Sequence, residues 1–186
     1  MQPIDTRDVA FGSGDSSEHI LFGGLSIGDD LGTGSGNLAL TGSIIQSTAI
    51  AASVYNSATQ NIPNITFTPM AFDTEVYDTD GIHDTVTNNT RLTCQTAGKY
   101  VMTGSVDASS NATGTRGIGI RLNGASIYGL TIVPASTGSG GRYLATVAIL
   151  DLAATDYVEL VAYQSSGGAL TYIAGVTYGF AMQRIA

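Results

Sequence analysis

The sequence predicts an all-β protein, and three of its features support this fold class. Its 186 residues include 24 glycines and only 12% charged residues, and Val, Ile, Tyr and Thr recur, as is typical of short strands joined by tight turns. From residue 99 onward, apolar and polar residues alternate in runs, which is the period of a half-buried strand. Asn123-Gly124 joins two such runs and indicates a hairpin, because both residues tolerate the positive φ of a type I′ turn. The length suits one well-buried domain plus an extension.

Eight segments carry the strand pattern, separated by turn-forming residues. Short strands and turn signals at regular spacing are typical of a sandwich. The segments at 142–152 and 156–164 are expected to form a strand pair. The expected strands are residues 65–72, broken near Pro69, and residues 99–107, 116–123, 126–133, 142–152, 156–164, 169–175 and 178–185.

The segment at 156–164 has an unusually apolar second face. Its even-numbered positions from 158 to 162 hold Val, Leu and Ala and are assigned to the core, whereas the odd-numbered positions hold Tyr157, Glu159, Val161 and Tyr163. Two tyrosines and a valine on a solvent-facing side are more than a monomer needs, which indicates burial against another subunit. The predicted subunit-interface residues are Tyr157, Val161 and Tyr163.

The N-terminal part of the chain has a different composition from the rest. There is no Asp, Glu, Lys or Arg between Leu31 and Met70, and Gly and Ser alternate with short apolar clusters at the start of this segment. Such a stretch cannot build a core alone, and its apolar side chains are unfavourable in water. We therefore divide the chain into an extended docking arm, residues 1–55, and a domain, residues 56–186, with a flexible linker as the alternative for the first part. The predicted partner-binding residues of the arm are Ile20, Leu21, Phe22, Leu25, Ile27, Ile44, Ile45 and Ile50.

The charge distribution argues against nucleic-acid and membrane partners. Residues 1–97 hold eleven acidic residues against two arginines, and residues 98–186 hold four against five basic residues. An acidic chain without a cluster of Lys and Arg lacks the surface that nucleic acid or anionic lipid requires. No apolar run approaches the roughly 20 residues that span a bilayer, and we expect no signal peptide in residues 1–10. Cys94 is the single cysteine, so it is expected to be a packed strand residue without an intramolecular disulfide.

The segment from Phe72 to Tyr100 resembles the opening of a C1q/TNF-like jelly roll, the family found in phage and bacterial structural proteins as well as in animals. In that family an aromatic strand end, a Tyr-Asp-x-x-Gly turn, a short polar strand and a Gly-x-Tyr strand start follow one another. Here these features are Phe72, Tyr77-Asp78, Gly81, residues 91–95 and Gly98-Lys99-Tyr100. The likeness continues at Leu122-Asn123-Gly124, at Asp156-Tyr157-Val158 with Leu160, and at Phe180.

The resemblance covers about residues 65–186 and implies an antiparallel jelly-roll sandwich that assembles as a homotrimer. It also implies that the N- and C-termini lie at one end of the sandwich and the recognition loops at the other. The arm departs from the family pattern, because it has neither collagen Gly-x-y repeats nor heptads. An animal protein with a collagen stalk is therefore not expected.

No motif in the sequence predicts an enzyme. A Gly-x-Ser-x-Gly nucleophile motif is absent, and only His19 and His83 could act as a base, so we expect neither a cofactor nor a small-molecule substrate. One acidic cluster leaves two alternatives, an exposed acidic rim or a calcium site, since calcium takes six to eight oxygen ligands. Its members are Asp73, Glu75, Asp78, Asp80 and Asp84.

Two functions fit the resemblance together with the arm. The first is a phage capsid decoration or cement protein on the capsid exterior, whose arm binds the major capsid protein or another virion protein while the jelly roll projects outward. The second is the receptor-binding tip of a tail fibre or a C1q-like adhesin that recognises a surface glycan or protein. In the second case the Gly-rich loops 109–117 and 135–141, with Arg116 and Arg142 at their ends, are the candidate recognition elements, with simple turns as the alternative.

Overall fold

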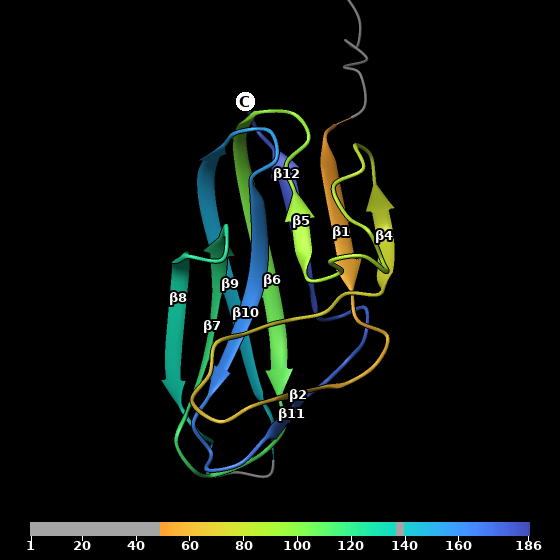
Figure 1. Ribbon diagram of the computed structural model, residues 1–186. Coiled ribbons are helices and arrows are strands. Elements are labelled where there is room, and N and C mark those ends of the chain that lie inside the picture. The colour runs from red at the N-terminus through yellow and green to blue at the C-terminus, as the bar shows by residue number, and fades with distance from the viewer. Residues whose placement is uncertain (1–48, 137–139) are drawn as a thin grey trace, which may run out of the picture. The chain divides into compact units, whose positions relative to one another are not determined.

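The computed structural model describes residues 49–136 and 140–186, and this part of the chain folds into twelve strands without a helix (Figure 1). In the described residues no helix is therefore long and apolar enough to cross a membrane. The strands are β1 (Ala51–Tyr55), β2 (Gln60–Ile62), β3 (Thr68–Pro69), β4 (Thr74–Asp78), β5 (Arg91–Thr93), β6 (Gly98–Ala108), β7 (Thr115–Leu122), β8 (Ser126–Pro134), β9 (Arg142–Leu152), β10 (Tyr157–Gln164), β11 (Leu170–Tyr172) and β12 (Gly179–Arg184).

The strands form two antiparallel sheets that pack face to face. The seven-stranded sheet has the order β2-β11-β6-β12-β1-β4, and β9 pairs with β6 along all eleven residues of both strands. The five-stranded sheet has the order β3-β10-β7-β8, and β5 also pairs with β10. In Figure 1 the start of β1 and the C-terminus lie at the same end of the strands, and the loops after β6, β8 and β10 lie at the opposite end. We call this opposite end the distal end.

Side chains from the inner faces of both sheets form one hydrophobic core. Tyr100, Met102 and Phe180 come from the seven-stranded sheet, and Ile118 and Leu160 come from the five-stranded sheet; all five are at most 1% exposed. These positions have the two-residue spacing that the sequence shows, because alternate residues of a strand point to the same side. The predicted all-β antiparallel fold is thus confirmed.

The hairpin prediction is confirmed as well. β7 and β8 pair around residues 123–125, and Asn123 and Gly124 have φ angles of 49° and 70°. The Ala125 N–H donates to the Leu122 carbonyl oxygen at 2.9 Å and closes the turn. Asn and Gly occur here because they adopt positive φ at low energetic cost.

Two strand predictions are wrong. The expected strand at 65–72 is reduced to the two residues of β3, and Ile65 has a φ of 56°, which no extended strand has. The expected pair of 142–152 with 156–164 does not form, because β9 pairs with β6 and β10 pairs with β7 in the other sheet. The tight turn between β9 and β10 therefore crosses from one sheet to the other.

The predicted boundary between arm and domain also lies too far along the chain. Ala51–Tyr55 was assigned to the arm, but it forms β1 and pairs with both β12 and β4. Ile50 was expected to bind a partner; instead it packs against the core, and its carbonyl oxygen accepts a hydrogen bond from the Arg184 N–H at 2.9 Å. The mixed small and apolar residues of this segment complete a sheet of their own chain.

The two sheets approach each other closely at Gly104 on β6, and a substitution at this residue tests that packing. A Cβ at this position would overlap the end of the Leu160 side chain inside the core, so Gly104→Ala is expected to lower the free energy of unfolding by about 1–3 kcal/mol. Gly168→Ala is the matched control, because no atom lies within 4 Å of the added Cβ. Urea unfolding measures both variants, and equal stability of the two would contradict this packing.

Candidate assembly surface

The outer face of the seven-stranded sheet, which points away from the five-stranded sheet, has small residues along its centre. Because strand side chains alternate, the outward positions of β6 are the odd-numbered ones, and their partners on β1, β12 and β9 face the same way. The central outward positions carry no long side chain. They are Ser53, Thr103, Ser105, Ala145, Gly179 and Ala181.

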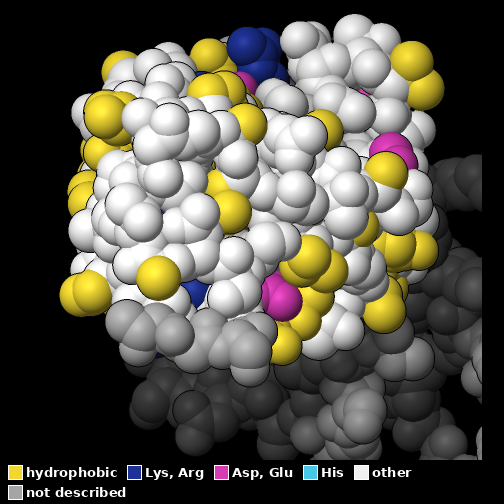
Figure 2. Space-filling view, turned by 90° about the horizontal axis from the view of Figure 1, so that it is seen from below, with side chains coloured by type: hydrophobic (Ala, Val, Ile, Leu, Met, Phe, Trp, Pro, Cys, Tyr) yellow, Lys and Arg dark blue, Asp and Glu magenta, His cyan; other side chains and the backbone are white. Residues whose placement is uncertain are grey.

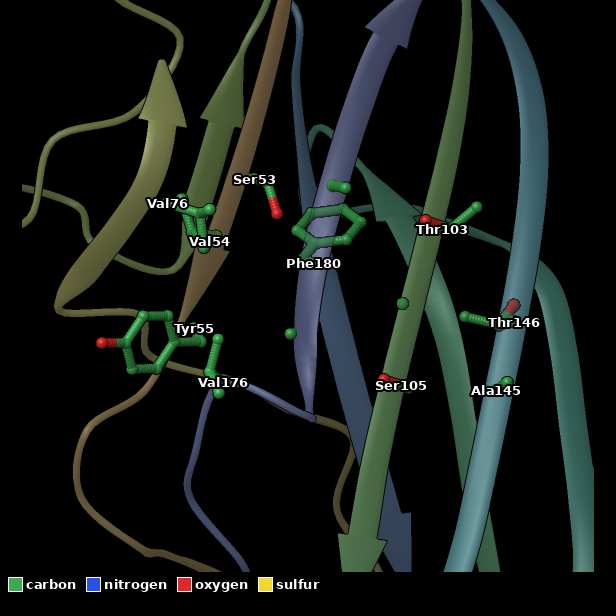
Figure 3. Close-up of a pocket in the computed structure, with 13 residues that line it drawn as sticks. Ser53, Val54, Tyr55, Val76, Thr103, Ser105, Ala145, Thr146, Val176 and Phe180 are labelled. Carbon is green, nitrogen blue, oxygen red and sulfur yellow. The ribbon is translucent and has the colours of Figure 1, made fainter.

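These small residues leave a hollow of about 390 Å³ on the outer face. Figure 3 shows its floor between β1, β12, β6 and β9, with the side chains of Tyr55, Val76 and Val176 grouped at one side. We call these three residues the Val76 rim. Val76 and Val176 are 55% and 71% exposed, so this rim is apolar and open to solvent.

The other side of the hollow is bounded by the edge strand β9. Its outward residues Tyr143, Val147 and Ile149 are 69%, 57% and 63% exposed, and we call them the β9 rim. Exposed apolar residues that lie singly need no explanation, but apolar residues that recur along one edge strand are unfavourable in a monomer. The hollow and its two rims therefore have the character of a surface that another molecule covers.

A second hollow, of about 480 Å³, continues this surface around the edge of the sandwich, between β9 and β8. Gly129 of β8 has a φ of 59°, and its carbonyl oxygen accepts a hydrogen bond from the Thr146 hydroxyl at 2.6 Å. The pairing of β7 with β8 shifts register at this point. Such an irregularity bends an edge strand and hinders the addition of a further strand. Side-chain packing is therefore the contact that this edge favours.

Charged groups on the outer face occur at the two ends of β6. At the end near the C-terminus, the Lys99 ammonium lies 3.1 Å from the Asp151 carboxylate, and both side chains are exposed. At the distal end Asp107 lies beside Tyr143. An uncharged centre with charges at its margins is compatible with an interface, whose charged groups are concentrated at the rim.

The three predicted interface residues on β10 differ in burial, because segments of the same chain cover this face in part. Val161 is fully buried and offers no surface to a second subunit. Tyr157 lies under the Arg91 guanidinium, 3.9 Å from the ring centroid, and Tyr163 contacts Phe67 with ring centroids 4.8 Å apart. Val161 therefore offers no interface surface, whereas Tyr157 and Tyr163 stay half-buried under segments that precede β10 in the chain.

Glu159, on the same face of β10, is the centre of a buried ion network. Its carboxylate accepts hydrogen bonds from Arg121 at 2.8 Å and 3.0 Å and from Thr90 at 3.2 Å, and Arg91 lies 3.6 Å away. A buried carboxylate requires such partners, since burial without them is strongly unfavourable. The network is structural: it holds β5 and β7 against β10.

The acidic residues between β3 and β5 stabilise turns. Asp73 accepts hydrogen bonds from the backbone and hydroxyl of Ser57, and Asp84 accepts hydrogen bonds from the backbone N–H groups of Val86 and Thr87. These hydrogen bonds lower the pKa of both carboxyls below the ordinary value. In residues 49–136 and 140–186, no three His, Cys, Asp or Glu side chains are placed to hold a metal ion.

His83 lies within this cluster as a buried turn residue. Its Nδ1 is 3.1 Å from Glu75 Oε1 and its Nε2 is 3.3 Å from the Asn89 carbonyl oxygen, while its backbone N–H donates to Asp78. Asp80 accepts a hydrogen bond from the Thr96 hydroxyl. The cluster thus closes the connection between β4 and β5.

A buried arginine, Arg116, supports the distal loop 109–117, although the sequence predicted this residue to be part of a candidate recognition loop. Arg116 is only 1% exposed, and its guanidinium donates to the carbonyl oxygens of Asn111, Thr113 and Thr115, each at 2.9 Å. Figure 2 looks at this end and shows a surface of mainly backbone and uncharged polar side chains, with scattered hydrophobic side chains and few charged ones. Arg116 therefore supports the loop from within and is not available to a ligand.

Several predicted site residues lie outside the described part of the chain. These are Ile20, Leu21, Phe22, Leu25, Ile27, Ile44 and Ile45 of the arm, together with residues 137–139 of the second candidate loop. The outer-face residues, by contrast, were not predicted. The sequence feature that points to them is the segment 142–152, which is apolar on both faces along most of its length.

Comparison with known proteins places this architecture in a class. No protein-family model matches the sequence, and no curated protein matches it. Solved structures do match: the globular domain of the zebrafish complement 1qA protein has 16% identity and a TM-score of 0.53, over 73% of this chain and 97% of that domain. A crystal structure of murine APRIL at pH 5.0 has 7% identity and a TM-score of 0.57, over 74% of this chain and all of that chain. The protein therefore has a C1q/TNF-like jelly-roll fold, as the sequence predicted.

The ion network on β10 can be tested by removing its central carboxylate. Glu159→Ala leaves the partly buried Arg121 without its partner, so the free energy of unfolding is expected to fall by roughly 2–4 kcal/mol. Asp151→Ala is the matched control, because it breaks an exposed ion pair on an edge strand, for which a change below about 1 kcal/mol is expected. Thermal and urea unfolding of the two variants measure the difference, and a loss no larger in Glu159→Ala than in Asp151→Ala would contradict the structural role.

Proposed function

We propose that the protein is a non-enzymatic structural protein that assembles as a homotrimer through the outer face of its seven-stranded sheet. The observation that carries this proposal is the hollow with its two apolar rims, which the described part of the chain leaves uncovered. Burial of exposed Val, Ile and Tyr side chains favours association by about 25 cal/mol for each Å² removed from water. No cofactor or small-molecule substrate is part of this function.

The shape of the face favours a ring over a two-fold dimer. The β9 rim projects at one edge of the outer face, and the small residues that it can enter lie towards the middle of the same face. When the rim of one copy packs into the hollow of the next, different surfaces meet, and such head-to-tail contacts generate closed rings. The resemblance to C1q/TNF-like domains supports three as the number of copies.

The function we propose for this trimer is that of a phage capsid decoration protein on the capsid exterior. The chain enters β1 at the end that also carries the C-terminus, so three N-terminal segments would leave the trimer at one end. Three segments that bind neighbouring capsid proteins together gain from effective concentration, even when each contact is weak. Their sequence is acidic up to residue 30 and then uncharged and rich in Gly and Ser, and its apolar clusters suit such a contact. The partner is the major capsid protein or another virion protein.

The second candidate is a receptor-binding tip of a tail fibre or an adhesin. One observation favours it: the distal loops are held by the buried Arg116, so a rigid support presents small polar groups. Loops on a rigid sandwich are a common place for recognition. In this case the N-terminal segment would attach the trimer to a fibre or baseplate.

The assembly face can be tested with two identical substitutions. Val147→Asp puts a charge on the β9 rim and is expected to convert trimers to monomers, because an unpaired charge at an interface strongly disfavours association. Val86→Asp is the control, since Val86 is 84% exposed in the connection between β4 and β5 and lines neither hollow of the assembly face. Sedimentation velocity measures the mass of each variant, and a trimeric Val147→Asp protein would refute the proposed interface.

Binding to the virion can be tested separately from trimer formation. Phage heads that lack this protein are mixed with the full chain, with a chain without residues 1–44, and with the full chain carrying Ile44→Asp and Ile45→Asp. Loss of head binding by both variants, with trimer mass retained, is the expected result. Undiminished binding by trimers without residues 1–44 would refute docking through the arm, and binding to host cells through the distal loops would favour the receptor-binding function.

A further inference from the structure

At the distal end of the outer face, the buried carboxyl group of Asp107 lacks a hydrogen-bond partner among the described residues for one of its two oxygens. Asp107 is an outward residue of β6, yet it is only 7% exposed. Its Oδ1 is buried and has no hydrogen-bond partner. A buried, unsatisfied carboxylate oxygen is unfavourable in the charged state of the group and calls for an explanation.

The groups around Asp107 do not neutralise it. On β9, Tyr143 lies opposite Asp107, and the preceding residue, Arg142, uses one nitrogen to donate to the Pro134 carbonyl oxygen at 3.0 Å. The Arg142 Nε is itself buried without a partner. From the segment before β12, Tyr178 makes a hydrogen bond to Asp107. The Arg116 guanidinium on β7 is occupied by three carbonyl oxygens, so no ion pair with Asp107 is found in the described residues.

The side chains around Asp107 line a recess that joins the surface that assembly would cover. Tyr143 and Tyr178 have ring centroids 5.9 Å apart and line a recess of about 200 Å³, which shares Ser105 and Ala145 with the central hollow. A second copy on the outer face would displace water from this recess. Removal of water disfavours the charged form of a carboxyl group and favours the neutral form.

We propose that Asp107 makes assembly through the outer face dependent on acid, so that the oligomer is tighter when this carboxyl group is protonated. The inference rests on the proposed function, because it requires the outer face to be the interface. Its physical basis is that an interface buries a neutral carboxyl group at far lower cost in free energy than an unpaired carboxylate.

The direction in which the association constant changes with pH follows from the pKa of Asp107 in the folded subunit. Burial raises the pKa of Asp107 above its ordinary value, and the hydrogen bond from Tyr178 opposes part of this rise. The hydrogen bond with Tyr143, with smaller contributions from burial and the Asp107 charge, raises the pKa of Tyr178 to about 12, so that this hydroxyl does not titrate between pH 4.5 and 7.5. Assembly raises the pKa of Asp107 further. The association constant is therefore highest below the pKa of Asp107 in the free subunit and falls as the pH rises towards its pKa in the oligomer.

The test compares the dissociation constant of the full chain at pH 4.5 and pH 7.5 by sedimentation equilibrium. Asp107→Asn mimics the neutral carboxyl group, and Asp151→Asn removes the same single charge from the exposed end of the same face. The wild type and Asp151→Asn are expected to bind at least roughly tenfold more tightly at pH 4.5, which corresponds to one pKa unit of coupling. Asp107→Asn is expected to remain tight at both values.

A second variant examines the same group by a different route. Tyr178→Phe removes the hydrogen bond that lowers the pKa of Asp107, so the pH at which the wild-type oligomer loosens is expected to move upward. Equal pH dependence in the wild type, Asp107→Asn and Asp151→Asn would overturn the inference while leaving the proposed assembly intact. A wild-type protein that is monomeric at both pH values would overturn both.

Discussion

In a sandwich of two sheets the inner faces bury one another, and each outer face must meet solvent, loops of the same chain or another molecule. In this protein the two outer faces differ in how far the same chain covers them. On the five-stranded sheet, Arg91 and Phe67 pack on two tyrosines of the central strand β10, and Glu159 is satisfied by a buried network. On the seven-stranded sheet the described chain supplies no such cover, so the hollow and its two rims stay open. The proposed assembly and its acid dependence both follow from this asymmetry.

The two strands that are apolar on both sides, β9 and β10, illustrate the limit of pattern analysis. Both have a second face with Tyr and Val or Ile, and the same argument about surplus apolar surface applies to either sequence. β10 is a central strand and is covered by its own chain, whereas β9 is an edge strand and exposes Tyr143, Val147 and Ile149. Which strand lies at the edge is a property of pairing, and pairing depends on residues far away in the sequence.

Polar residues show the same limit. The sequence places Arg116 at the end of a loop, where a charged residue is expected to face solvent. In the structure the guanidinium turns inward, because three loop carbonyl oxygens converge on it. Asp107 likewise occupies an outward position of an amphipathic strand, but the neighbouring strand and the segment at Tyr178 bury it. Burial of such residues depends on convergence of separate loops, which has no local signature.

Local patterns were sufficient for the fold class, the β7–β8 hairpin and most strands from β6 onward, because strand periodicity and positive φ at Asn123-Gly124 are properties of neighbouring residues. The tertiary structure decided the rest. It drew β1 into the sheet although its segment resembles the arm, separated β9 from β10 into opposite sheets, and left exposed apolar residues along the edge strand β9. Each of these outcomes depends on long-range pairing and on which apolar surfaces remain after the core has formed.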